Sequence, residues 1–212
     1  NNAGQILINP TSGLPVLDAN FRVRGDRNPD FTMGINNSFR WKNLSITMLW
    51  DWRMGGDVFN GTNMFLTLNG RSLKTEDRMT PRVIDGVLND GLQNSANPTR
   101  NNIVVIPYFQ QDYYTTTMPE EEFIEKNINW LRLRDVTLTY NLNNVISKKQ
   151  KFFKTLSVFV TGNDLIMFTN YSGADPMVNG NTAGTRGVGA AGFDFGNIAV
   201  PISFNVGFRT SF

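Results

Sequence analysis

The sequence contains no cysteine and no histidine. These two absences exclude disulfide bonds, thiolate zinc sites, cysteine nucleophiles and every catalytic triad or metal cluster that needs an imidazole. Neither sign of charge is in large excess, since the net charge at pH 7 is only +2. That balance gives no reason to expect a nucleic acid as partner. We therefore expect no catalytic residue, no metal site, no cofactor and no nucleic-acid partner.

Long apolar runs are missing too. No run approaches the roughly 18 apolar residues of a transmembrane helix, so that class of span is excluded. A transmembrane β-barrel stays open, since its spans are alternating segments of about ten residues that average hydropathy barely detects. The chain starts at Asn1 with neither an initiator methionine nor a signal peptide, so we expect it to be processed or a fragment.

Apolar and polar residues alternate with a period of two in several segments, which is typical of β-strands. The pattern fills FTMGINNSFRW (31–41), stops at the tight turn Lys42-Asn43 and resumes in LSITMLWDWR (44–53). These segments predict a long hairpin. Further strands are predicted in INWLRLRDVTLTYNL (128–142), TLSVFVTGNDLIMF (155–168) and IAVPISFNVGFRTSF (198–212).

The parity of the alternation changes inside the third predicted strand. Leu131 and Leu133 fall on odd positions, whereas Val136, Leu138 and Tyr140 fall on even ones. A single extra residue shifts the parity in this way, so we expect a bulge or a loss of pairing near Arg134-Asp135.

The connections between the predicted strands are short on one side of the sheet and long on the other. Residues 42–43 and 143–154 form the short ones, while the Gly- and Asn-rich segments 57–126 and 169–197 form the long ones. Outer-membrane barrels show this asymmetry. A short helix is predicted in the long loop at PEEEFIEK (119–126), where proline and acidic residues stand at the favourable N-terminal end.

Aromatic side chains are expected at both ends of the strands, as in the girdles of a membrane-facing wall. At the short-turn end these are Phe39, Trp41, Phe208 and Phe212, and at the long-loop end Phe31, Trp50, Trp52 and Phe168. The residues expected to face lipid on the last strand are Ile198, Val200, Ile202, Phe204, Val206 and Phe208.

Three segments together resemble the late barrel strands of SusC/RagA-type TonB-linked outer-membrane proteins. They read GDRNPDFTMGINNSFRWKNLSITMLWDWRMGGDVFN, NWLRLRDVTLTYNL and LSVFVTGNDLIMFTNYSGADPMV. The order and spacing agree with the family. The sequence departs from it at Trp41, where the family usually has tyrosine, and at Asn143, where it often has proline.

The resemblance implies an all-β fold: about five C-terminal antiparallel strands of a large transmembrane β-barrel with long extracellular loops. Residues 1–212 would be the C-terminal part of one barrel domain, without the plug and the earlier strands. So few strands cannot close a barrel, and open edges in lipid leave backbone groups unpaired, so the remainder of the same barrel must pair with them. Phe212 would be the barrel's C-terminal signal, on the periplasmic side.

The function implied by the resemblance is TonB-dependent import of oligosaccharides or peptides across the bacterial outer membrane. The implied partners are a SusD-like surface lipoprotein, the TonB complex through the absent N-terminal part, and outer-membrane lipid. Tyr171 and Asp175 are possible substrate or loop contacts, although SGADP (172–176) is first of all a turn sequence. Arg132, Arg134 and Asp135 would face the lumen, either toward substrate or paired with one another.

Three alternatives remain open. A SusC-like barrel could have an assembly or scaffold role in the envelope, because fold does not fix function. The strands could instead build a soluble carbohydrate-binding β-sandwich, which also alternates. An enzyme would need a carboxylate pair, for which Glu120 to Glu122 are the candidates.

Overall fold

The computed structural model describes residues 1–143, 154–177 and 191–211. The chain divides into two compact units, here called the loop unit and the sheet unit. The loop unit comprises Asn1–Gly25, Phe59–Glu125 and Phe193–Gly196, and the sheet unit comprises Asp26–Val58, Lys126–Gly192 and Asn197–Phe212.

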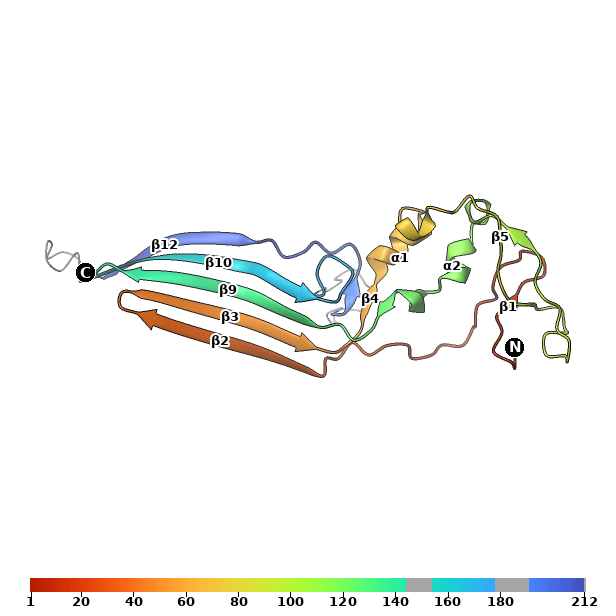
Figure 1. The fold of residues 1–212 in the computed structure, drawn as a ribbon, viewed down its shortest axis with the longest axis horizontal. Coiled ribbons are helices and arrows are strands. Elements are labelled where there is room, and N and C mark those ends of the chain that lie inside the picture. Colours follow the sequence, from red (N-terminus) through yellow and green to blue (C-terminus); the bar gives the residue numbers. More distant parts are fainter. Residues whose placement is uncertain (144–153, 178–190, 212) are drawn as a thin grey trace. The chain divides into compact units, whose positions relative to one another are not determined.

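The sheet unit is built on five antiparallel strands in the order β12-β10-β9-β3-β2 (Figure 1). Their bounds are Phe31–Trp41 (β2), Leu44–Met54 (β3), Trp130–Asn141 (β9), Thr155–Thr169 (β10) and Ser203–Ser211 (β12). All are longer than the usual strand of about five or six residues. The predicted number, type and sequence order of the long strands are confirmed.

The predicted hairpin is present between β2 and β3. Its register runs from Phe31 opposite Met54 to Trp41 opposite Leu44, which leaves Lys42 and Asn43 as the turn. Lys42 has a φ of 51°, in the left-handed region that two-residue hairpin turns of the primed types use. The tight turn therefore fixes which side chains of the two strands share a face.

The predicted bulge is confirmed, and it lies at Arg134. On β3 the neighbours Leu49 and Trp50 stand opposite Asp135 and Leu133, so Arg134 is an extra residue on β9. The register between β9 and β10 shifts at the same level. The bulge restores the apolar residues on both sides of it to one face of the sheet.

The register gives the sheet an apolar and a polar face. Apolar residues lie side by side on one face, for example Ile46 opposite Leu138 and Val160 opposite Val206. On the polar face, Thr137 and Thr161 form a hydrogen bond of 2.8 Å between their hydroxyl groups. This arrangement follows from the period-two alternation, because successive side chains of a strand point to opposite faces.

The last strand begins later than predicted. We expected it from Ile198, but β12 starts at Ser203. Pro201 has no backbone N–H to give to a neighbouring strand, and the N–H of Val200 donates instead to Oδ2 of Asp175 at 3.3 Å. Residues 198–202 therefore leave the ladder. The predicted C-terminal signal, Phe212, lies outside the described residues.

The loop unit consists of short elements joined by turns. Its short strands are β1 (Leu7–Ile8), β4 (Val58–Asn60, whose first residue belongs to the sheet unit), β5 (Arg82–Val83), β6 (Val87–Leu88), β7 (Val104–Val105), β8 (Ile124–Glu125) and β11 (Phe193–Asp194). Its helices are α1 (Gly61–Leu68) and α2 (Tyr113–Thr117), with 3-10 turns η1 (Leu73–Thr75), η2 (Pro107–Phe109) and η3 (Glu120–Phe123). Leu14, Val105 and Tyr113 form a small buried cluster.

The helix predicted at 119–126 is shorter than expected. Only Glu120–Phe123 are helical, as the 3-10 turn η3, and the strand β8 follows immediately. Glu121 forms an ion pair with Arg24 at 3.2 Å. Among the helices of the described ranges, none combines the length and the apolar character that a membrane crossing needs.

Candidate functional site

A buried ion network lies at the long-loop end of the sheet, and Arg132 of β9 is its centre. The residue is only 2% exposed. Its guanidinium forms an ion pair with Oδ1 of Asp164 at 3.2 Å and donates a short hydrogen bond to Oδ1 of Asp175. A buried charge persists only when it is paired and hydrogen-bonded, and two carboxylates meet that requirement here.

Asp175 ties three segments together. Besides the contact with Arg132, its carboxylate accepts hydrogen bonds from the N–H groups of Met177 at 2.9 Å and Val200 at 3.3 Å. Burial by itself would raise the pKa of Asp175, but the hydrogen bonds from Arg132 and the two amides outweigh it and hold this pKa below its ordinary value. The group is therefore a carboxylate at neutral pH.

Tyr171 belongs to the core of the sheet unit. It is buried in one cluster with Val58, Ile128 and Trp130, and Met177 packs against that cluster. Gly173 sits so close that a Cβ there would collide with the Tyr171 ring. The structure thus gives Tyr171 and Asp175 a packing role in the loop that follows β10, and their contact with a substrate stays a prediction.

The predicted charged patch is present as a set of ion pairs, but its acids differ from the prediction. Arg134 lies 3.7 Å from carboxylate oxygens of both Asp51 and Asp164. Asp135, which we expected to pair with the arginines, takes part in none of the ion pairs shown by the described residues. The partners come from β3, β10 and the following loop, and only strand pairing brings them near.

The residues predicted to face lipid are exposed. Their side chains range from 42% exposed at Val200 to 94% at Ile198. The apolar face of the sheet continues this surface, with further exposed side chains at Phe39, Trp41, Leu138, Tyr140, Val158 and Val160. Contiguous apolar surface of this extent on a protein marks contact with a partner or with a membrane.

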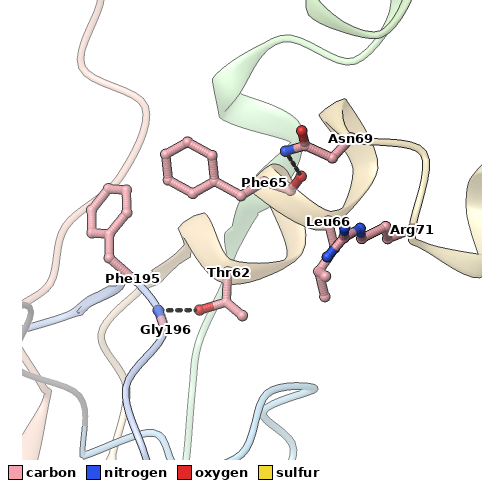
Figure 2. Close-up of a pocket in the computed structure, with 7 residues that line it drawn as sticks. All are labelled: Thr62, Phe65, Leu66, Asn69, Arg71, Phe195 and Gly196. Atoms are coloured by element: carbon pink, nitrogen blue, oxygen red, sulfur yellow. Dashed lines mark hydrogen bonds between the residues drawn. The ribbon is translucent and has the colours of Figure 1, made fainter.

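A second candidate site is a hollow of about 460 Å³ in the loop unit (Figure 2). It is lined by Thr62, Phe65, Leu66, Asn69, Arg71, Phe195 and Gly196. Helix α1 begins here because the side chain of Asn60 accepts a hydrogen bond from the N–H of Asn63 at 2.9 Å, an N-cap. It ends just before Gly70, which has a φ of 64°.

The far wall of the hollow comes from another part of the chain. The Thr62 hydroxyl donates to Oδ1 of Asp194 at 2.6 Å and accepts from the N–H of Gly196 at 2.7 Å, which fixes Phe195 beside α1. The Phe195 ring lies 5.6 Å from that of Phe59 and 5.9 Å from that of Phe65, between ring centroids. Sequence reasoning missed this site, because no local pattern joins residues 193–196 to α1.

Over residues 1–143, 154–177 and 191–211, no group of three or more acidic side chains is placed to hold a metal ion. The polar groups of the two candidate sites are guanidinium, carboxylate, amide and hydroxyl groups.

Comparison with known proteins finds relatives named TonB-dependent receptors. No family model matches the chain. TonB-dependent receptor P3 of Formosa agariphila is 27% identical over 218 residues, which cover 99% of this chain and 19% of the relative. TonB-dependent receptor P26 of the same organism is 26% identical over 196 residues, covering 90% and 18%. The chain is homologous to TonB-dependent receptors. It spans about a fifth of the length of the curated relatives it matches.

The fold of the chain also matches a solved structure. The RagAB peptide importer in its 'closed-closed' state superposes with a TM-score of 0.56 at 19% identity, covering 93% of this chain and 20% of the solved chain. A match at this identity shows the fold. The predicted resemblance to the SusC/RagA type and the predicted all-β class with long antiparallel strands are confirmed.

Proposed function

We propose that this chain is the C-terminal part of the barrel wall of an outer-membrane TonB-dependent transporter that imports oligosaccharides or peptides. The observation that carries the proposal is the sheet with one apolar, exposed face and one polar face. Homology to proteins named TonB-dependent receptors supports the transport class. The similarity to a structure titled as a peptide importer supports peptides as one substrate class.

The two faces of the sheet have the polarity that a transmembrane wall requires. Lipid-facing and lumen-facing residues alternate along barrel strands, and an Arg or Lys on the lipid face costs about 2–4 kcal/mol at the bilayer midplane. On the polar side of the sheet, Arg134 forms ion pairs with Asp51 and Asp164, and Arg132 forms one with Asp164. Water in the channel of a barrel can solvate these charged side chains, so the polar face suits the channel side of the wall.

The two edge strands of the sheet, β2 and β12, support the proposal that further strands pair with this chain. Within the described residues, β2 is hydrogen-bonded only to β3, and β12 only to β10. A strand edge left open in hydrocarbon exposes backbone N–H and C=O groups that each cost several kcal/mol. We therefore propose that the remainder of the same barrel pairs with both edges and supplies the plug through which TonB acts.

The proposed partners are a SusD-like surface lipoprotein and the TonB complex. In this arrangement the long loops face outward and the short turns face the periplasm. The similarity to the structure titled the RagAB peptide importer supports this choice of partners. Tyr171 and Asp175 would then shape the loop after β10 and so the external vestibule.

Two measurements on the full-length protein test the proposal. Recovery in the outer-membrane fraction, with release only by detergent, is expected, whereas a buffer-soluble monomer would favour the β-sandwich. Uptake of labelled oligosaccharides or peptides should be lost when the TonB-interacting segment is deleted. Unchanged uptake would favour the scaffold role in the envelope.

A further inference from the structure

We propose that the hollow between α1 and Phe195 binds the C-terminal residue of a short peptide with an apolar side chain. In this assignment the Arg71 guanidinium takes the terminal carboxylate, and the rings of Phe65 and Phe195 take the side chain. The inference rests on the proposed import function and names one cargo class and its binding contact.

The apolar wall of the hollow is preformed and open. Phe65 is 50% exposed although it contacts Phe195, whose ring also contacts Phe59. Mutual ring contacts of this kind hold aromatic side chains in place before a ligand arrives. Preorganised apolar surface binds more tightly because little side-chain entropy is lost on binding. Leu66, also exposed, extends the apolar lining.

The charge of the hollow calls for an anionic group. Arg71 lines it, is exposed, and forms no ion pair and no side-chain hydrogen bond with any residue in the described ranges. By contrast, Arg82 of the same unit pairs with Asp77 at 2.9 Å. A guanidinium presents planar, parallel N–H donors that match a carboxylate in a bidentate contact. The unpaired fork of Arg71 is thus suited to a terminal carboxylate.

The second polar group fits the backbone of the same ligand residue. The side-chain Nδ2 of Asn69 donates to the carbonyl of Phe65 at 2.7 Å, which fixes the amide. Its Oδ1 accepts no hydrogen bond from the described residues and can accept one from a peptide N–H. The hydroxyl of Thr62 is already engaged on both sides. A ligand that matches these groups of the hollow has one carboxylate, one N–H donor and one apolar side chain. The last residue of a peptide has all three.

A neutral oligosaccharide matches the same lining poorly. Sugar recognition uses many hydroxyl hydrogen bonds, whereas this hollow offers a single free guanidinium and a single free amide oxygen among its lining residues. A sugar without a carboxylate would leave Arg71 unpaired. The composition of the walls therefore favours the peptide end.

The test is equilibrium binding to the detergent-purified full-length protein. The probes are acetyl-Ala-Ala-Leu as the free acid and the same peptide with a C-terminal amide. We expect the acid to bind about tenfold tighter, the ratio that a charge-assisted pair of roughly 1.4 kcal/mol gives. Arg71→Gln should remove this difference, and Phe65→Ala should weaken both peptides. Lys74→Gln and Phe109→Ala, exposed residues outside the hollow, are the matched controls.

Several outcomes would overturn the assignment. These are equal binding of acid and amide, no binding of the acid, an acid-to-amide ratio that Arg71→Gln leaves intact, or loss of binding in the control variants as well. Preferential binding of a uronic-acid oligosaccharide would likewise overturn it. The TonB dependence of uptake is measured separately, in a protein whose hollow is unchanged. Failure of transport can therefore be distinguished from failure of the hollow to bind the end of a peptide.

Discussion

Arg132 of β9 donates a hydrogen bond to the carboxylate of Asp175, and both side chains are almost completely buried. The contact joins a strand of the sheet to the loop after β10, and through the Val200 amide it reaches the segment before β12. The buried pair of Arg132 and Asp175 thus holds the loop after β10 and the segment before β12 against β9 at this end of the sheet.

Asp175→Asn should destabilise the sheet unit strongly. Removing one partner of a buried pair typically costs about 3–5 kcal/mol, and the loss should lie near the lower end because Asp164 still pairs with Arg132 in the variant. Thermal unfolding of the full-length protein in detergent measures the loss. The control is Asp18→Asn, which breaks the exposed pair between Asp18 and Arg22 and should leave the melting temperature almost unchanged. Similar shifts for both variants would contradict the role of the Arg132 contact.

The same pair predicts an acid sensitivity. The pKa of Asp175 is lower in the folded protein than its unfolded value of about 3.9, so its contribution is fully present above that value. The contribution is lost as the pH falls through the lower, folded pKa. Unfolding measured from pH 7 to pH 2 should show a drop in stability on the acid side that is smaller in Asp175→Asn. An equal drop in both proteins would assign the acid sensitivity to other groups.

The opposite faces of β12 should respond differently to a charge. Val206→Arg places a guanidinium on the apolar face and should cost roughly 2–4 kcal/mol if that face meets the bilayer midplane. Asn205→Arg, one residue away on the polar face opposite Thr161, should cost far less. The folded fraction after refolding into lipid vesicles reports both. Equal losses would mean that the apolar face does not lie in lipid.

Gly207→Ala should disturb the polar face of the sheet. A Cβ at Gly207 would come within 2.6 Å of Cζ of Phe159, whose ring also lies 5.2 Å from the Arg209 guanidinium. Overpacking of this kind costs about 1–3 kcal/mol. Gly34→Ala is the matched control, because a Cβ there meets nothing within 4 Å. A melting temperature that falls equally in both variants would argue against close packing at Gly207.

The features that depend on local sequence were predictable. The β2–β3 hairpin follows from alternation around a two-residue turn, and the bulge at Arg134 follows from a change of parity within one strand. The start of β12 was predicted too early because alternation continues through 198–202. Pro201, which has no N–H, and the hydrogen bond from the Val200 N–H to Asp175 remove that stretch from the ladder.

The features that depend on distant segments were not predictable. Arg132 finds its acids only when β9 pairs with β10, so the sequence neighbour Asp135 was expected instead. The hollow was missed for the same reason, since Phe195 reaches α1 through contacts of Thr62 with residues far along the chain. Charge pairing and cavity walls are properties of the assembled fold, whereas periodicity is a property of each strand.

The central claim, that one face of the long strands touches hydrocarbon, can be measured with single labels. The 212 residues contain no cysteine, so one cysteine at Val206 or at Asn205 can carry an environment-sensitive fluorophore in a cysteine-free full-length background. In vesicles, the label at 206 should be quenched by brominated lipid and shielded from aqueous iodide, and the label at 205 should show the reverse. Equal access of iodide to both positions, with no quenching by lipid, would contradict the account.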